Sequence, residues 1–319
     1  MTLEQTQYVG IDVSLDYLDV GLYPLKKVER FENSASGILE LCEFVKAYTV
    51  EKVVLEATGG LEYSAALTLK KQGFAVCVVN PARTAAFRAM QGNLTKTDAQ
   101  DAKLLAEFAK RMEPEEGGVL DENQKHLKEL VVRRRQLVGL ITQENHRQLL
   151  MTSPEMKRSL KTVVTALKQE LSYIEVLLLS AIHAVDELRE RFNLLKTIPA
   201  IGPVVAATLV TEMPELGNLT RKQATSLTGL APHNNDSGKK QGYARTQGGR
   251  RTVRSALYMS AVVAMRRNPV LKSFYERLVL SGKPKKLALV AVMRKLIIIA
   301  NQILKSQRPW QEDFKVMTS

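Results

Sequence analysis

Four carboxylates follow short apolar runs or share one helix face, positions from which they could meet and bind a metal ion. Asp12 follows the short apolar run at 8–11, and Glu56 ends a second one at 53–55. Asp98 and Asp101 lie three residues apart, on one face of an expected helix. Four converging carboxylates repel one another, and a bound cation with hard oxygen ligands, Mg²⁺ or Mn²⁺, relieves that repulsion. Two such ions, about 3.5–4 Å apart, would clamp the attacking and leaving oxygens of a phosphodiester.

Each acid alone also has a plainer interpretation. An aspartate near a strand end is commonly a turn residue, and one in a first helical turn commonly interacts with the helix dipole. The joint pattern of Asp, then Glu, then Asp-x-x-Asp, each at a suitable element, favours one shared metal site. We expect Asp16 and Asp19, in contrast, to be surface residues.

The elements that must position these acids follow from apolar patterning. Short β-branched and aromatic runs predict strands, and apolar residues at helical spacing predict helices. Strands are expected at 8–13, 17–23, 28–32, 52–56 and 74–79, and helices at 39–48 and 62–72. This order is typical of a ribonuclease-H-like (resolvase-like) α/β domain. Thr97 is a good N-cap for the helix that carries Asp98 and Asp101.

The middle of the chain has a different pattern. An acidic, Gly-containing stretch at 113–118 predicts a domain boundary, and 127–192 is long, charged and helical. Apolar residues near a/d spacing on both sides of Pro154 indicate an antiparallel coiled-coil arm, either a dimerisation element or an internal bundle. We therefore expect three parts: 1–112, 113–193 and a mainly α-helical, basic 194–319.

Positive charge is concentrated at the C-terminal end. The 319 residues hold 46 Lys and Arg and 33 Asp and Glu; residues 221–319 contain 20 basic and 4 acidic ones, leaving 26 and 29 elsewhere. This asymmetry favours a polyanion partner, although a solvated basic surface is the alternative. Two cysteines and a polar N-terminus without a signal peptide indicate a cytoplasmic protein. The apolar stretch 287–304 contains Arg294 and Lys295, which predicts a buried helix and no membrane span.

The segment 199–203, with sequence PAIGP between two apolar helical pieces, is similar to a helix-hairpin-helix element. Such a turn offers backbone N–H groups to a DNA phosphate, here near Gly202. Ala200 stands where the first hairpin glycine is expected, so an ordinary helical hairpin remains an alternative.

Motifs along nearly the whole chain resemble one known family. The chain is similar to the IS110 group of insertion-sequence transposases, to which Piv-type DNA invertases are related. The segments that carry the resemblance are VGIDVS, VVLEATGG, KTDAQDAKLLA, TIPAIGP, GLAPHNNDSGK and GGRR.

The resemblance implies a metal-binding DEDD domain, a coiled-coil arm and a C-terminal transposase domain with a serine nucleophile. The metal-binding acids then fall on Asp12, Glu56, Asp98 and Asp101, and the nucleophile on Ser237. Without the resemblance, a loop Ser beside Gly is commonly a turn residue. The basic residues around that loop would hold nucleic acid: Lys239, Lys240, Arg245, Arg250, Arg251 and Arg254.

The resemblance also implies partners. These are donor and target DNA and a structured non-coding bridge RNA that pairs with both. Because the acids and Ser237 are expected in separate domains, we predict a composite site in a homodimer or homotetramer. Two alternatives stay open: a metal-dependent nuclease, junction resolvase or site-specific invertase, and a non-catalytic nucleic-acid-binding protein.

Overall fold

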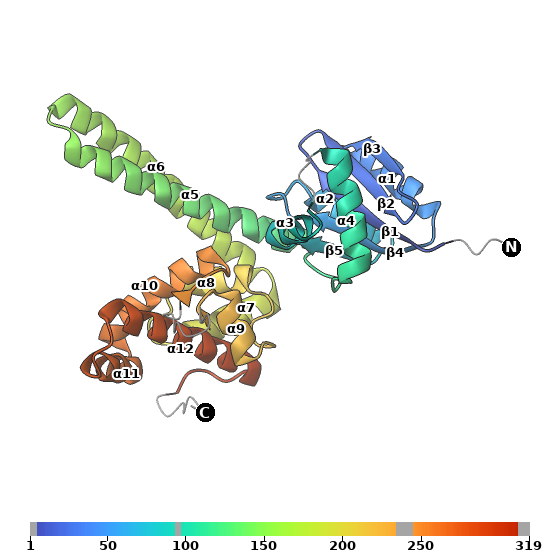
Figure 1. The fold of residues 1–319 in the computed structure, drawn as a ribbon. Helices are drawn as coiled ribbons and strands as arrows, with labels where there is room; N and C mark the ends of the chain where they lie inside the picture. Colours follow the sequence, from blue (N-terminus) through green and yellow to red (C-terminus); the bar gives the residue numbers. More distant parts are fainter. Residues whose placement is uncertain (1–4, 93–96, 234–244, 312–319) are drawn as a thin grey trace. The chain divides into compact units, whose positions relative to one another are not determined.

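The computed structural model describes residues 5–92, 97–233 and 245–311. The chain divides into two compact units, Met1–Glu122 and Asn123–Ser319, whose elements Figure 1 labels. The first is a mixed α/β unit and the second is mainly helical. Residues 123–193 lie in the second unit with the C-terminal helices, and a further division at 193 stays a prediction.

The first unit is built on a five-stranded sheet with the order β3-β2-β1-β4-β5. β1 and β2 pair antiparallel, as do β2 and β3, whereas β1, β4 and β5 run parallel. The strands confirm those expected from the apolar runs. Their bounds are β1 Gln7–Val13, β2 Tyr17–Tyr23, β3 Val28–Glu32, β4 Val50–Glu56 and β5 Val76–Val79.

Helices cover both faces of this sheet (Figure 1). On one face, α1 (Ala35–Lys46) and α2 (Tyr63–Lys71) bury apolar residues against Val9 and Ile11 of β1. The other face carries α3 (Pro81–Met90) and α4 (Asp98–Met112). Because side chains alternate along a strand, Gly10 and Asp12 lie on the α4 face.

Two glycines let α4 lie directly on the strands. Gly10 of β1 and Gly21 of β2 are paired across the ladder. A Cβ on Gly10 would lie 2.1 Å from the backbone nitrogen of Ala106, and one on Gly21 would lie 2.7 Å from the carbonyl carbon of Ala102. The α4 backbone therefore rests where side chains would otherwise stand.

Helix α3 was not expected from the sequence, which predicted only that the preceding strand ends at Asn80 and Pro81. In the structure these two residues start the helix. The Asn80 side chain accepts a hydrogen bond from the Ala82 N–H at 2.8 Å, and Pro81 occupies the first turn. Both are ordinary helix-start signals, and reading them would have found α3.

The second unit contains two long helices, α5 (Glu122–Leu150) and α6 (Pro154–His183), that lie side by side (Figure 1). Arg134 of α5 pairs with Glu175 of α6 at 2.8 Å. The remaining helices are α7 Asp186–Lys196, α8 Pro203–Glu212, α9 Arg221–Leu227, α10 Arg251–Arg267, α11 Pro269–Leu280 and α12 Lys285–Ser306, and a short β6 (Pro232–His233) pairs with β7 (Arg245–Thr246).

The core of this unit gathers buried residues from α5 to α8, α10 and α12. Helix α12 is long and apolar enough to cross a membrane by length and composition. Its apolar residues, such as Val292, Leu296 and Ile303, are instead packed into the core, as in the central helix of a globular unit.

Filling the space under α4 should disrupt the first unit. We expect Gly10→Val to lower its free energy of unfolding by about 3 kcal/mol, because the side chain has no room against the α4 backbone. Urea unfolding followed by circular dichroism measures this. As a control, Gly139→Ala places a methyl in open space on α5 and should be neutral or stabilise by up to about 1 kcal/mol. Equal stability of Gly10→Val and the wild type would contradict the packing.

Candidate functional site

The first unit brings the predicted carboxylates into one electrostatic neighbourhood. Burial, together with the negative charges of Asp101, Asp98, Glu56 and Asp19 in decreasing order of effect, raises the pKa of Asp12 to about 6. Asp12 lies in β1, Glu56 ends β4, and the other two predicted acids lie in the first turn of α4. Three elements distant in sequence therefore place their acids where each affects Asp12.

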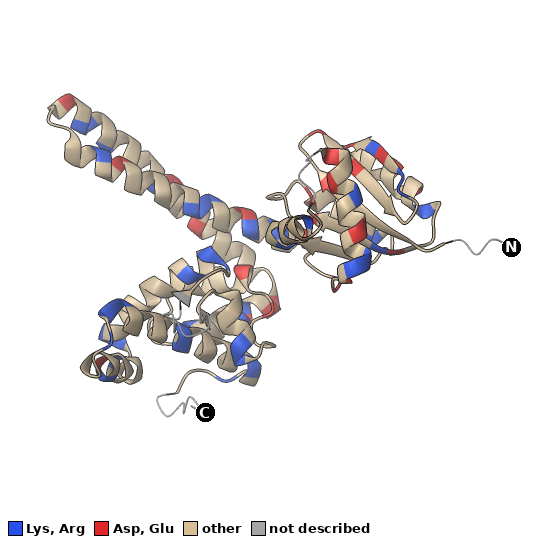
Figure 2. Cartoon of the chain, viewed as in Figure 1, with Lys and Arg blue, Asp and Glu red and all other residues tan. Residues whose placement is uncertain are grey.

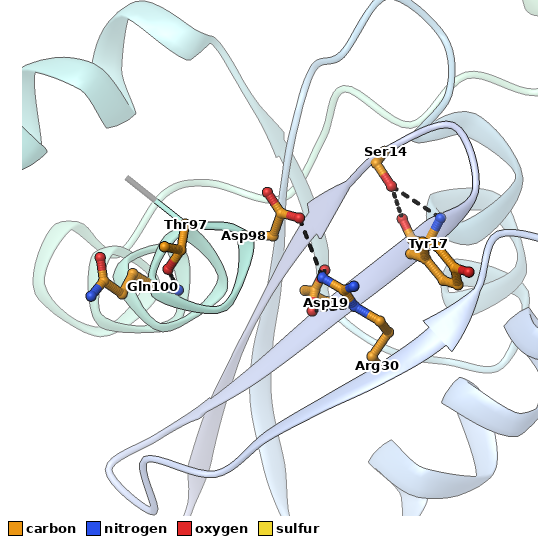
Figure 3. Close-up of polar contacts among 7 residues, drawn as sticks. All are labelled: Ser14, Tyr17, Asp19, Arg30, Thr97, Asp98 and Gln100. Atoms are coloured by element: carbon orange, nitrogen blue, oxygen red, sulfur yellow. Dashed lines mark hydrogen bonds and ion pairs between the residues drawn. The ribbon is translucent and has the colours of Figure 1, made fainter. Parts of the chain in front are cut away.

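Asp19 is buried, so the expectation that it would be a surface residue is wrong. It pairs directly with Asp12 across β1 and β2 and is only 3% exposed. Arg30 of β3 neutralises it with two contacts, Nε to Oδ1 at 3.0 Å and Nη2 to Oδ2 at 2.9 Å. The same Nη2 contacts Asp98 Oδ2 at 3.2 Å, so Arg30 lies between the two acids (Figure 3). The sequence signal was the alternation that puts Asp19 on the same face as Gly21.

The missed helix α3 supplies two further contacts to the acids. The buried Thr84 hydroxyl donates a hydrogen bond to Glu56 Oε2. Arg88 Nη1 lies 2.7 Å from Asp101 Oδ1. That oxygen is buried and receives no well-aligned hydrogen bond, so the contact is a charge pairing.

The donor set suits a divalent cation in its chemistry. All four predicted ligands are carboxylates, and Asp101 Oδ1 is a buried acceptor with unused capacity. However, within the described ranges no three His, Cys, Asp or Glu side chains form a ready metal-binding group. Two of the acids, Asp98 and Asp101, are held by arginines instead.

In the second unit, Ser237, Lys239 and Lys240 lie outside the described residues. The chain leaves the described part at β6 and re-enters it at β7, and these two strands pair, with His233 opposite Arg245. Close backbone contact fixes the flanking turns: a Cβ on Gly249 would lie 2.0 Å from the Gly229 nitrogen. The ends of the segment that carries Ser237 are therefore held together.

The predicted arginines near this segment differ in their contacts. Arg250 Nη1 lies 2.5 Å from Glu215 Oε1 and donates to the Glu212 carbonyl at 2.7 Å. Arg254 Nη1 donates to the Gly248 carbonyl at 2.9 Å. These two side chains thus stabilise the unit itself, and a nucleic-acid contact for them stays a prediction.

Arg251 faces a groove that the sequence analysis did not foresee. The groove lies between α5, α8 and α10 and has a volume of about 740 Å³. Arg135 of α5 also lines it, and its Nη1 donates to the Thr252 hydroxyl at 2.6 Å. Val204 and Val205, at the N-terminus of α8, lie on the same groove. Arginines and the start of a helix favour an anion there.

The turn between α7 and α8 contains a residue in a backbone conformation that favours glycine. Ala200, at the position where glycine is expected, has φ +90°, a left-handed value that favours glycine. Gly202 is the residue before α8 and has φ −83°, open to any residue. Basic residues are much more frequent than acidic residues on α10, α11 and α12 (Figure 2).

Comparisons with known proteins agree along most of the chain. Residues 192–276 match the family described as "Transposase IS116/IS110/IS902 family". Residues 9–152 match a second transposase family, of the DEDD IS110 type. The two matches cover the acid-bearing unit with α5, and the hairpin, glycine turns and α10.

Individual relatives extend this likeness. The pilin gene-inverting proteins of Moraxella bovis and Moraxella lacunata are each 28% identical over 323 residues, covering 96% of this chain and 98% of theirs. An uncharacterized 43.6 kDa protein of insertion element IS110 from Streptomyces coelicolor is 27% identical over 149 residues, covering 46% of this chain and 36% of its own.

The raised pKa of Asp12 gives the metal-free protein a pH dependence. Its folded pKa of about 6 exceeds the ordinary aspartate value of 3.8, so the stability from this group is present below pH 4 and is lost as pH rises to 6. In EDTA at pH 7, Asp12→Asn should therefore raise the free energy of unfolding by about 1 kcal/mol. This is less than the full energy equivalent of the pKa shift, because Asp12 is partly exposed and solvent screens its charge.

Urea unfolding between pH 4 and 7.5 measures this effect. The exposed Asp16 provides the matched control, since Asp16→Asn removes a carboxylate outside the cluster. If both variants gain equally at pH 7, the crowding of acids around Asp12 is wrong.

Proposed function

The chain belongs to the IS110 family of transposases and is a DNA recombinase, and on that premise we propose its chemistry. DNA is cut and rejoined through the Ser237 hydroxyl, with divalent Mg²⁺ or Mn²⁺ held by Asp12, Glu56, Asp98 and Asp101. The observation that carries this proposal is that β1, β4 and the first turn of α4 place Asp12, Glu56, Asp98 and Asp101 close enough for the other acids, with burial, to raise the pKa of Asp12.

The architecture supports the proposal. A sheet in the order β3-β2-β1-β4-β5, with three leading antiparallel strands, a parallel β4 and β5 and a helix across β1, is the arrangement expected of a ribonuclease-H-like domain. We assign residues 113–193, which include α5 and α6, as the coiled-coil arm and residues 194–319 as the transposase domain. Leu137 of α5 and Val164 of α6 are buried apolar residues outside the core of the C-terminal helices, and Arg134 pairs with Glu175 between the two long helices.

The protein's own residues then have separate tasks. The bound ions would supply positive charge to the phosphate oxygens during transfer. Thr84 fixes the Glu56 carboxylate by its hydrogen bond. The Ser237 oxygen forms a bond to phosphorus as one P–O bond of the DNA strand breaks; the serine proton leaves to a base, and the displaced sugar oxygen gains one. The phosphoserine link keeps the bond energy, so a DNA hydroxyl can later displace the serine.

We further propose how the site is assembled and guided. Ser237 and the acids belong to different units of the chain, which supports a composite site shared within a homodimer or homotetramer. Donor and target DNA are the substrates, and a structured bridge RNA that pairs with both would select the sequence, as in other guided systems. Mixed Asp12→Ala and Ser237→Ala proteins should regain strand transfer; no recovery would contradict sharing between subunits.

Site-specific DNA inversion is a second candidate outcome of the same chemistry. The relatives aligned over 96% of this chain are named as pilin gene-inverting proteins. Inversion and transposition use the same cutting and joining steps and differ in where the two DNA sites lie. The serine and metal roles proposed here apply to both.

Denaturing gels of reactions with labelled DNA test the nucleophile. Wild-type protein should form a covalent protein–DNA adduct, because the serine oxygen remains bonded to phosphorus. Ser237→Ala should form none and should lose at least about 1000-fold in strand transfer, the scale of losing a nucleophile.

Ser226, in helix α9 and outside the segment that carries Ser237, provides the control, and Ser226→Ala should leave the adduct intact. Wild-type adduct formation by Ser237→Ala would refute the serine mechanism. Free DNA ends without any adduct in the wild type would instead identify a metal-dependent nuclease.

The groove predicts a nucleic-acid contact on α5. Arg135→Ala should weaken DNA binding by about tenfold and reduce the salt dependence of log K by about one, because one phosphate contact is lost. Fluorescence anisotropy at several salt concentrations measures both. Arg133, an exposed residue of the same helix that does not line the groove, is the control. Equal loss in Arg133→Ala would mean that only overall charge matters.

A further inference from the structure

Arg88 holds a distinctive place among the acids. It extends from α3, near the end of that helix, and its Nη1 lies 2.7 Å from Asp101 Oδ1. Its side chain is only 24% exposed. Besides Asp101, the charges of Glu56 and Asp12 act on it and raise the pKa of its guanidinium. Arg88 thus pairs with one proposed metal ligand and lies within the electrostatic influence of two others.

The second arginine at this face, Arg30, has a different bond pattern. It grips the buried Asp19 through two parallel contacts, a geometry that gives both strength and fixed orientation. Asp19 is not among the proposed metal ligands, so this pair can persist when the site is loaded. Arg88 has no such anchor: its ion pair uses one oxygen of Asp101, and that oxygen lacks a well-aligned hydrogen bond.

A divalent ion and Arg88 would compete for the same lone pairs. A metal ligand offers its carboxylate oxygen directly to the ion, and Asp101 Oδ1 is the atom that Arg88 now faces. Repulsion among the acids is relieved by whichever cation is present.

We propose that Arg88 is the exchangeable counter-ion of the acid cluster: it neutralises Asp101 in the metal-free protein and, once metal is bound, turns its guanidinium to the DNA phosphate at the site. This inference rests on the proposed function. A released guanidinium beside the cluster keeps its charge and finds one new anion there, the phosphate that the ions also contact. Its planar fork matches phosphate oxygens, and it would stabilise charge that develops during transfer.

Metal affinity tests the first half of this exchange. Titration of the metal-free protein with Mn²⁺, followed by isothermal calorimetry or by electron paramagnetic resonance of free Mn²⁺, should give at least tenfold tighter binding for Arg88→Gln than for the wild type. Arg83→Gln is the matched control: Arg83 is on the same helix but lies over the Phe108 ring, and its loss should leave Mn²⁺ affinity unchanged. Unchanged or weaker Mn²⁺ binding by Arg88→Gln overturns the proposal.

Chemical modification of Arg88 in the wild-type protein tests the exchange without relying on a variant that must fold. Arg88 should react slowly with phenylglyoxal in EDTA, at least fivefold faster with Mn²⁺, and slowly again when DNA is added with Mn²⁺. Peptide mapping quantifies each state. A reactivity that Mn²⁺ does not change would overturn the exchange.

Strand transfer tests the second half. At saturating Mn²⁺, Arg88→Gln should lose about 100-fold in rate, and Arg88→Lys should recover part of it, because an ammonium supplies charge without the fork. A purely structural Arg88 would lower stability in EDTA without tightening metal binding. If Asp12→Asn leaves Mn²⁺ binding intact, the proposed metal site itself is wrong. If Asp12→Asn abolishes Mn²⁺ binding but the Arg88 variants do not behave as expected, the metal site is supported and the exchange by Arg88 is refuted.

Discussion

The direct contact between helix α4 and the paired glycines Gly10 and Gly21 is the constraint on which the first unit depends. Because neither glycine has a Cβ, the helix backbone approaches the two strands closely at these positions. That approach fixes the position of the α4 first turn, and with it Asp98 and Asp101. Two residues further along β1 on the same face stands Asp12. A bulkier residue at either glycine would lift the helix and separate the acids.

Close packing of carboxylates has a cost, and the structure shows what offsets it. Burial and the neighbouring acids raise the pKa of Asp12, Asp19 is neutralised by Arg30, and Asp101 is neutralised by Arg88. The fold thus keeps a cluster that is unfavourable without cations, a feature common at sites built for charged reactants. In the proposed function, a divalent ion would offset the same repulsion that the arginines offset here.

In the second unit, some arginines form hydrogen bonds and ion pairs within the unit, and others line an open groove. Arg250 and Arg254 bind carbonyl oxygens and a glutamate within the unit, and so hold the glycine turns that flank the segment carrying Ser237. Arg251 and Arg135 instead line an open groove beside the start of α8. A motif such as GGRR therefore contains one residue that stabilises the turn and one that is available to an anion.

Local pattern was enough for the strands and for the Thr97 cap of α4, because these depend on neighbours in sequence. It was also enough to recognise the family. The burial of Asp19, the ion pair of Arg88 and the groove at Arg135 needed the tertiary structure. Each arises from a partner on a distant element, and a residue's own neighbours in sequence carry no information about which distant charge will meet it.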